Sequence, residues 1–468
     1  MNSARVFTIE SPVNPQTKAS RLVTDHFRCP KEFVDLTVSS AQMSEPGYFR
    51  FGADSICYGS CSSSPTSPHV TENLHDALPH TTYNGLSIEL PFDPVQVLDN
   101  LRHERYVSCS NRKKAPDKSK STARKLYYLA RPLLPVALRK HLQRVYLRDW
   151  KRIPFPHWPV DSTVEEIQEQ LLALAMKSRN VTAIPFIWFW PKGAPSCTSV
   201  THDVEAPAGL DFCNELMDLD DSYGIKAAFQ MVPEERYEVT LQHFVKMRER
   251  GFEVNLHDLN HDGNLVSDYD EFLRRAKEIN VYAKKFGTRG FRAGVLYRNL
   301  DWYGMLDFEY EMSVPNVAHL DPQRGGCCTV FPFFNGTMIE LPVTMSQDYT
   351  LFNILNDYSI DLWKEQIACV RKKHGLMQMI VHPDYVMDRK AQKVYGQLLG
   401  YLADMRAQGE TWIALPGEVA DWWRLRNQMN LVKKGNSWQI EGQGHEDARI
   451  AYARLVDGKI QYELEMNQ

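Results

Sequence analysis

Two histidines and two carboxylates in this sequence are spaced as the ligands of a metal ion would be. His257 and His261 are four residues apart, so a helical turn or a tight loop would place both imidazoles on one side. Asp203 and Glu205 are two residues apart, so in an extended segment they point the same way. Such carboxylates repel each other unless a cation or a shared proton lies between them. One carboxylate and two imidazoles would form a three-ligand hydrolytic centre, which leaves the other carboxylate to act as a base.

A purely structural role is the alternative for each pair. Histidines at this spacing also arise by chance, and the acidic pair could be an exposed strand end. The context favours a site, because a predicted strand leads into His257 and the residues around the two histidines include Asp, Asn and Gly, which are unusual in a core.

Four polar motifs follow predicted strands, and they include Arg292 and His382. The motifs occupy residues 201–205, 255–261, 290–294 and 380–384. In parallel α/β sheets and barrels, the loops at the carboxyl ends of the strands converge on one mouth, where catalytic groups gather. We therefore expect the four motifs to form a single site.

The elements that must position this site begin near residue 181, where short β-branched or aromatic runs alternate with segments of helical period. The predicted strands are 198–202, 226–232, 253–256, 290–292, 310–314, 376–381 and 411–415. The predicted helices are 210–223, 234–250, 269–286, 351–373 and 389–407. This alternation predicts an α/β fold with a parallel sheet, either doubly wound or closed as a barrel.

Two hairpins are also predicted. Asn335-Gly336 joins 329–334 to 338–343, and we expect this hairpin to be an insertion. Asp457-Gly458 joins 450–456 to 459–464, which we expect to form a small β appendage with 437–441.

The first 180 residues carry no chemical motif. Residues 86–90 are a predicted strand, 95–106 and 163–177 are predicted helices, and Ser162 with Glu165 is a predicted capping box. Residues 135–150 combine apolar and basic positions, as in a helix on an anionic membrane surface or in the solvated face of a packed helix. The predicted division of the chain is 1–83 of unclear fold, 84–180 as an α-rich extension, 181–428 as the barrel and 429–468 as the β appendage.

Composition limits the functional classes. The 468 residues include 54 basic and 58 acidic side chains, a net charge of −4, which gives no general case for a nucleic-acid partner. The first 20 residues show no secretory signal, and no apolar run reaches the roughly 18 residues of a membrane span. Nine cysteines without a Cys-x-x-Cys pair indicate a reducing, cytoplasmic location. These features predict no particular oligomeric state.

In sequence order, Thr201-His-Asp-Val-Glu205, His257-x-x-x-His261, Phe291-Arg292 and Val381-His382-Pro383 resemble the motifs of the metal-dependent polysaccharide deacetylases. This family is also called the NodB-homology or carbohydrate esterase family 4 group, and the resemblance covers about residues 181–425. It implies an irregular (β/α)7 barrel, here with an N-terminal α+β extension and the C-terminal β appendage. It also implies hydrolysis of N- or O-acetyl groups on sugars.

The resemblance implies a role for each site residue. Asp203 would be the catalytic base, Arg292 the residue that orients it, and His382 the catalytic acid. Glu205, His257 and His261 would hold one divalent ion, with Zn²⁺ as the expected metal.

Three features depart from the family pattern. Val204 separates the two carboxylates, as in the cyclic-amide and cytoplasmic members, and the Arg-Pro-Pro-Tyr motif is reduced to Arg292-Ala-Gly-Val. The tryptophan motif has two candidates, Trp302 and Trp363.

The predicted function is a metal-dependent hydrolase that removes an acyl group, in particular acetyl, from an amino sugar or an acetylated glycan. An acetylated saccharide would be its partner. The alternatives are a cyclic amide or ureide hydrolase on the same barrel, and a catalytically silent glycan-binding or scaffold protein.

Overall fold

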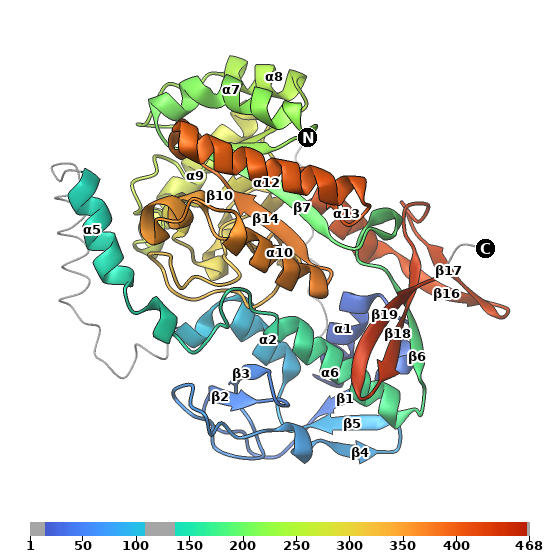
Figure 1. Cartoon of the computed structure of the whole chain (residues 1–468). Helices are drawn as coiled ribbons and strands as arrows, with labels where there is room; N and C mark the ends of the chain where they lie inside the picture. The colour runs from blue at the N-terminus through green and yellow to red at the C-terminus, as the bar shows by residue number, and fades with distance from the viewer. Residues whose placement is uncertain (1–14, 108–135, 466–468) are drawn as a thin grey trace, which may run out of the picture.

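A curled sheet of nine strands forms the centre of the computed structural model, which describes residues 15–107 and 136–465 (Figure 1). Seven of its strands run parallel in the spatial order β13-β11-β10-β9-β8-β7-β14. They are β7 (Cys197–Val204), β8 (Ala228–Met231), β9 (Glu253–His257), β10 (Gly290–Arg292), β11 (Tyr310–Glu311), β13 (Met338–Glu340) and β14 (Leu376–Ile380). The short strands β12 (Phe333–Asn335) and β15 (Trp412–Ile413) pair with β13 and with the start of β7.

The two ends of the parallel sheet meet through the segment that follows β13. The Met345 N–H donates to the Gln378 carbonyl at 3.2 Å, and the Thr344 hydroxyl donates to the Leu376 carbonyl at 2.7 Å. These bonds close seven parallel strands into a barrel, which confirms the predicted irregular (β/α)7 fold. The hairpin expected at 329–343 forms between β12 and β13, but it is not an insertion, because β13 pairs in parallel with β11 and is itself a barrel strand.

Helices cover the outside of the barrel. They are α7 (Pro207–Ser222), α8 (Leu241–Glu249), α9 (Tyr269–Phe286), α10 (Asp361–Lys372), α11 (Pro383–Val386), α12 (Arg389–Ala407) and α13 (Pro416–Gln428). The bounds of α9 agree with the prediction because both of its ends have capping residues. The Asp268 carboxylate accepts from the Glu271 N–H at 2.9 Å, and Gly287 ends the helix in the left-handed conformation at φ 61°.

Two predicted helices are shorter than their apolar pattern. The helix expected at 234–250 begins only at Leu241, because Glu235 adopts φ 64° and Thr240 with His243 caps the later start. The helix expected at 351–373 is broken. A π-helical turn, η8 (Thr350–Leu355), ends at Asn356 with φ 55°, and α10 starts afresh at Asp361.

The N-terminal extension packs below the barrel in Figure 1. Its helices are α1 (Pro15–Phe27), α2 (Pro94–Arg102), α5 (Val136–Leu147) and α6 (Thr163–Ser178). Its strands are β1 (Leu36–Val38), β2 (Gly47–Arg50), β3 (Ile56–Gly59), β4 (Thr82–Asn84) and β5 (Ser87–Leu90). Since β1 pairs with β5, one small sheet joins residues on both sides of position 83.

The capping box predicted before α6 is not formed. The Thr163 N–H donates to the Asp161 carboxylate at 2.9 Å, and the Ser162 hydroxyl donates to Glu166 at 2.8 Å. Glu165 instead turns into the core, where its side chain is buried and accepts a hydrogen bond from the Thr329 hydroxyl. A tertiary contact has therefore replaced the local one.

Replacing Glu165 by Gln should make the protein more stable at alkaline pH. Burial raises the pKa of Glu165 from 4.5 to about 8, more than the Thr329 hydrogen bond and the Lys373 charge lower it. Between these values the folded chain binds more protons than the unfolded chain, so stability falls as pH rises, by about 1.4 kcal/mol per pH unit. The glutamine side chain stays neutral, so the free energy of unfolding of Glu165→Gln should not fall in this way. Urea unfolding measured between pH 4.5 and about 8 checks this. The exposed Glu238→Gln should behave like wild type, and parallel pH curves for all three proteins would contradict the prediction.

Residues 430–464 form two hairpins, and the one around Asp457-Gly458 was predicted, but its third strand is not the expected 437–441. β16 (Asn430–Lys434) pairs with β17 (Ser437–Glu441). β18 (Ile450–Val456) pairs with β19 (Lys459–Leu464) and, on its other side, with β6 (Ala183–Ile187), not with β17. The apolar β6 offers the better edge, because Phe186 faces Ala451 there and both side chains are buried.

Two general features complete the fold. Every cysteine in the described residues is unpaired. None of the described helices combines the length and apolar character that a bilayer span requires.

Candidate metal centre

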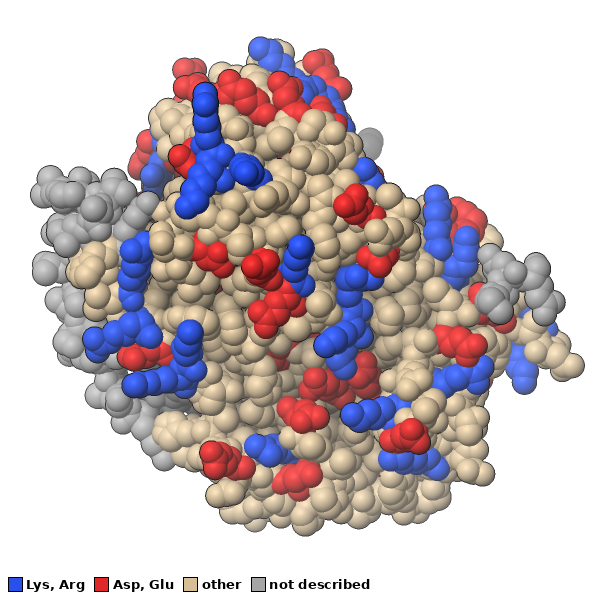
Figure 2. Space-filling view, viewed as in Figure 1, with Lys and Arg blue, Asp and Glu red and all other residues tan. Residues whose placement is uncertain are grey.

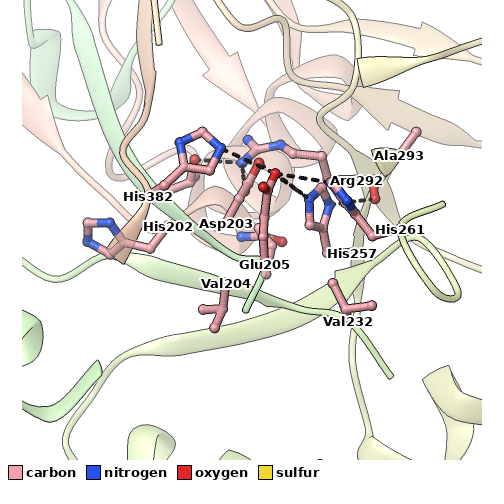
Figure 3. A network of polar contacts seen from close by, with 12 residues as sticks. His202, Asp203, Val204, Glu205, Val232, His257, His261, Arg292, Ala293 and His382 are labelled. Atoms are coloured by element: carbon pink, nitrogen blue, oxygen red, sulfur yellow. Dashed lines mark hydrogen bonds and ion pairs between the residues drawn. The ribbon is translucent and has the colours of Figure 1, made fainter. Parts of the chain in front are cut away.

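All six residues singled out in the sequence meet at the carboxyl ends of the barrel strands (Figure 3). Asp203 lies near the end of β7, and Glu205 follows that strand directly. His257 ends β9 and His261 lies in the loop after it, Arg292 ends β10, and His382 stands two residues beyond β14. The shared mouth expected for the four motifs is present.

Successive side chains of β7 point to opposite faces of the strand, so only alternate residues lie in the site. Asp203 and Glu205 point toward the other site residues, whereas His202 and Val204 point away (Figure 3). His202 is buried outside the site, where its ring nitrogens contact the Val381 carbonyl at 2.9 Å and the Asp220 carboxylate at 3.0 Å. The intervening Val204 therefore keeps both carboxylates on one face.

Glu205, His257 and His261 have the geometry of a three-ligand metal site. One ligand atom from each lies within 4.8 Å of the others. His261 Nε2 is 3.0 Å and His257 Nε2 is 4.0 Å from Glu205 Oε1. Both Nε2 atoms are buried and face Glu205, but neither makes a well-aligned hydrogen bond within the described residues, although buried polar atoms nearly always do. Two imidazoles and a carboxylate suit a divalent ion such as Zn²⁺, so these donors fit the implied metal.

The loop after β9 sets the orientation of the two imidazoles. Asp258 and His261 adopt left-handed backbone angles, φ 60° and 54°, so the pair sits on a tight loop and not on a helix. His257 Nδ1 lies 3.2 Å from the Arg292 carbonyl, which places the ring proton there and leaves Nε2 as the donor atom for a metal. Arg236 holds the loop from the other side by donating to the His261 carbonyl.

Asp203 is held by a buried arginine that crosses the barrel. Arg292 Nη1 donates to Asp203 Oδ1 at 2.5 Å and to the Thr201 hydroxyl at 2.8 Å, and Nε donates to the Met312 carbonyl at 2.9 Å. Burial opposes ionisation of Asp203, but the charges of Arg292, His257 and His382 and the Arg292 hydrogen bond together outweigh it and lower the pKa of the carboxyl below its usual value. Asp203 is therefore a fixed carboxylate 3.7 Å from His257 Nε2, at the edge of the ligand cluster.

His382 is held by a carboxylate that the sequence did not reveal. Asp348 accepts from His382 Nδ1 at 2.7 Å and from the His382 backbone N–H at 2.8 Å. Burial lowers the pKa of His382, but the charge and hydrogen bond of Asp348, together with the charges of Glu205 and Asp203, outweigh it and raise the pKa to about 10. The other ring nitrogen, Nε2, lies 3.6 Å from Glu205 Oε1, so a protonated imidazole faces the ligand cluster.

Sequence reasoning missed Asp348, Arg236 and Asp258. Asp348 lies five residues beyond the predicted strand 338–343, outside the strand-end motifs, and no spacing signal links it to His382. Trp363, one of the two tryptophan candidates, supports this segment by donating to the Ser346 carbonyl at 2.7 Å. The other candidate, Trp302, packs on Tyr269 with ring centroids 5.3 Å apart.

Gly294, two residues after Arg292, lies against the loop that carries His261 and gives a test. A Cβ at Gly294 would lie 2.5 Å from Asp258 Oδ2 and 2.9 Å from His261 Cδ2. Gly294→Ala should therefore displace the His261 ring and weaken metal binding by about 10–100-fold, as loss of outer-shell support does. Gly304→Ala is the matched control, because a Cβ there meets nothing within 4 Å. Equal metal affinities for the two variants, measured by competition with a chelator, would refute this role for Gly294.

Comparison with known proteins gives structural matches only. No family model and no curated protein matches this sequence. A structure from Mycobacterium smegmatis assigned as a polysaccharide deacetylase is 16% identical, with a TM-score of 0.42 over 54% of this chain and 98% of its own. A Bacillus subtilis peptidoglycan deacetylase is 13% identical, with a TM-score of 0.32 over 49% and 93%. A cobalt-bound family 4 acetyl xylan esterase from Clostridium thermocellum is 14% identical, with a TM-score of 0.30 over 48% and 91%.

The chain is thus similar in structure to polysaccharide deacetylases over about half of its length, at low identity. With TM-scores below 0.5, these structures assign no residue roles to this chain.

Proposed function

We propose that this chain is a metal-dependent hydrolase, a divergent polysaccharide deacetylase that removes an acetyl group from an amino sugar or an acetylated glycan. The observation that carries the proposal is the cluster of Glu205, His257 and His261, in which both buried Nε2 atoms face the Glu205 carboxylate without a well-aligned hydrogen bond. An anchored carboxylate and a protonated imidazole border the same cluster. These are the parts that acyl transfer to water requires.

Glu205, His257 and His261 would hold the ion, with Zn²⁺ as the metal we propose. When bound, a divalent ion of this kind polarises an acyl carbonyl and lowers the pKa of a water molecule. Asp203 is placed to accept the proton of the attacking water, because Arg292 keeps it ionised and fixes its orientation.

His382 supplies the complementary proton. Its pKa of about 10 means that the imidazole is protonated at neutral pH, and Nε2 is the ring atom that faces the ligand cluster. It can therefore protonate the departing amine of an N-acetyl sugar or the departing alcohol of an O-acetyl sugar. Asp203 and His382 differ in charge because one is paired with Arg292 and the other with Asp348.

The proposal is tested by acetate release from a panel of acetylated saccharides, measured with Zn²⁺-loaded protein. The panel contains chitin oligomers and acetylated xylan oligomers, and a cyclic ureide is included as a separate substrate. Acetate release that disappears in His257→Ala supports the proposal. Turnover of the ureide alone would replace it with cyclic amide hydrolysis, and one bound metal without turnover of any substrate would favour a silent binding protein.

A further inference from the structure

The helix α5 presents an apolar face to solvent. Leu142, Val145 and Tyr146 have exposed fractions of 41%, 46% and 64%, and their spacing places them on one face of the helix. Leu147 points the other way and is buried. Among the described helices, α9 follows with two large exposed apolar side chains, Tyr269 and Val281. In Figure 1, α5 stands at the edge of the molecule.

Basic side chains accompany this apolar face. Residues 144–152 include Arg144, Arg148, Lys151 and Arg152 against one acid, Asp149. The Arg148 and Arg152 side chains are 73% and 86% exposed, and their contacts with Asp149, at 3.8 and 3.7 Å, are too exposed to neutralise them strongly. Elsewhere, Figure 2 shows acidic and basic side chains interspersed across the face viewed. The segment therefore differs in charge from its surroundings.

The position of α5 links it to the metal centre. Its Gln143 accepts a hydrogen bond from the Tyr349 hydroxyl, and Arg144 Nε donates to the Asn353 carbonyl of η8 at 2.8 Å. The Tyr349 ring lies 5.2 Å from Tyr385, which lies 5.0 Å from His382. A partner bound to α5 would therefore lie close to the part of the site that contains His382.

We propose that α5 and the residues after it form a docking surface for an anionic lipid membrane. The α5 surface consists of Leu142, Val145, Tyr146, Arg148, Lys151 and Arg152. An apolar face flanked by exposed arginine and lysine is the composition of helices that lie in the headgroup region, with apolar side chains inserted and cations on anionic headgroups. Trp150 packs against Trp158, with ring centroids 4.8 Å apart, and adds an aromatic pair of the kind found at membrane interfaces. In combination with the proposed function, this surface would present a membrane-bound acetylated saccharide to the site.

Co-sedimentation of the full chain with vesicles tests the proposal. We expect binding to vesicles of phosphatidylcholine with phosphatidylglycerol, and much weaker binding to phosphatidylcholine alone. Each basic residue near an anionic surface contributes about 1 kcal/mol, so the double variant Arg148→Gln/Arg152→Gln should bind about 30-fold more weakly. At about 1 M salt, where the Debye length is about 3 Å, charge-driven binding should be largely lost. Leu142→Ser/Tyr146→Ser should also weaken binding, because it removes apolar area that would enter the headgroup region.

Two controls make the result specific. Lys433→Gln/Lys459→Gln removes the same charge from the C-terminal hairpins, on the opposite side of Figure 1, and should bind like wild type. His257→Ala should also bind like wild type, so failure of the metal site and failure of membrane docking can be told apart.

The proposal is overturned if wild type does not bind the anionic vesicles. It is equally overturned if the two α5 variants bind like wild type, or if the Lys433/Lys459 control loses as much binding as they do. Unchanged thermal midpoints for all variants would show that a loss of binding does not come from unfolding.

Discussion

The double variant His257→Ala/His261→Ala should contain no metal ion and release no acetate. It removes both imidazole donors of the cluster and leaves Glu205 alone, and a single carboxylate does not hold a divalent ion in a protein site of this kind. Metal analysis after purification should give one ion per chain for wild type and none for the variant. Wild type should also lose stability when a chelator is added, by about 4 kcal/mol where free metal is a thousandfold above Kd, whereas the variant should not respond.

His445→Ala is the matched control for this experiment. His445 is an exposed histidine of the C-terminal region, and within the described residues its ring contacts the local Gly442 carbonyl and the neighbouring Glu446. Its loss should change neither metal content nor the response to chelator. One ion per chain in the His257/His261 variant would place the metal elsewhere in the molecule.

The chemistry of this site was predictable because it depends on short sequence spacing. Asp203 and Glu205 share a face because a strand alternates every residue, and this holds whichever fold surrounds the strand. Arg292 and His382 were found because each stands where a β-rich run ends. Parallel strands then bring these ends to one mouth, so a local pattern was enough to predict a site assembled from residues 203 to 382.

The residues that position the site were less accessible from sequence. Asp348 lies on an irregular segment between β13 and η8, and nothing in its spacing connects it with His382, 34 positions later. Its pairing depends on how the barrel closes, because the segment after β13 is also the one that bonds to β14. Strand β13 was assigned to an insertion for the same reason. Its Asn-Gly turn predicted β12 as a partner, but no local signal indicated parallel pairing with β11.

Long-range pairing also decided the C-terminal region. The hairpin around Asp457-Gly458 was predicted because its turn is local, but its third strand, β6, lies more than 260 positions earlier in the chain. Likewise, Glu165 had the spacing of a capping residue, yet its carboxylate bonds to Thr329 in the core. In both cases the turn or helix itself was correct, and a distant contact determined what it packs against.

Replacing each of the two site carboxylates by its amide should have different effects on metal content and on turnover. Glu205 Oε1 is 3.0 Å from His261 Nε2, whereas Asp203 is fixed on Arg292 at 2.5 Å and only borders the ligand cluster. Asp203→Asn should therefore keep its metal and lose turnover by about 10²–10⁴, which is the contribution of a general base. The amide oxygen can still accept from Arg292, so this variant should fold, with reduced stability because a buried guanidinium loses its counter-charge.

Glu205→Gln should behave in the opposite way, because a neutral amide replaces the anionic ligand of the cation. We expect its metal content to fall, with activity falling in proportion, and excess Zn²⁺ should restore part of both. The same excess should restore nothing in Asp203→Asn, since metal is not what that variant lacks. Metal content and acetate release measured on both proteins decide the assignment. Loss of metal in Asp203→Asn with retention in Glu205→Gln would exchange the roles of base and ligand, and retention in both would leave the two histidines to bind the ion without either carboxylate.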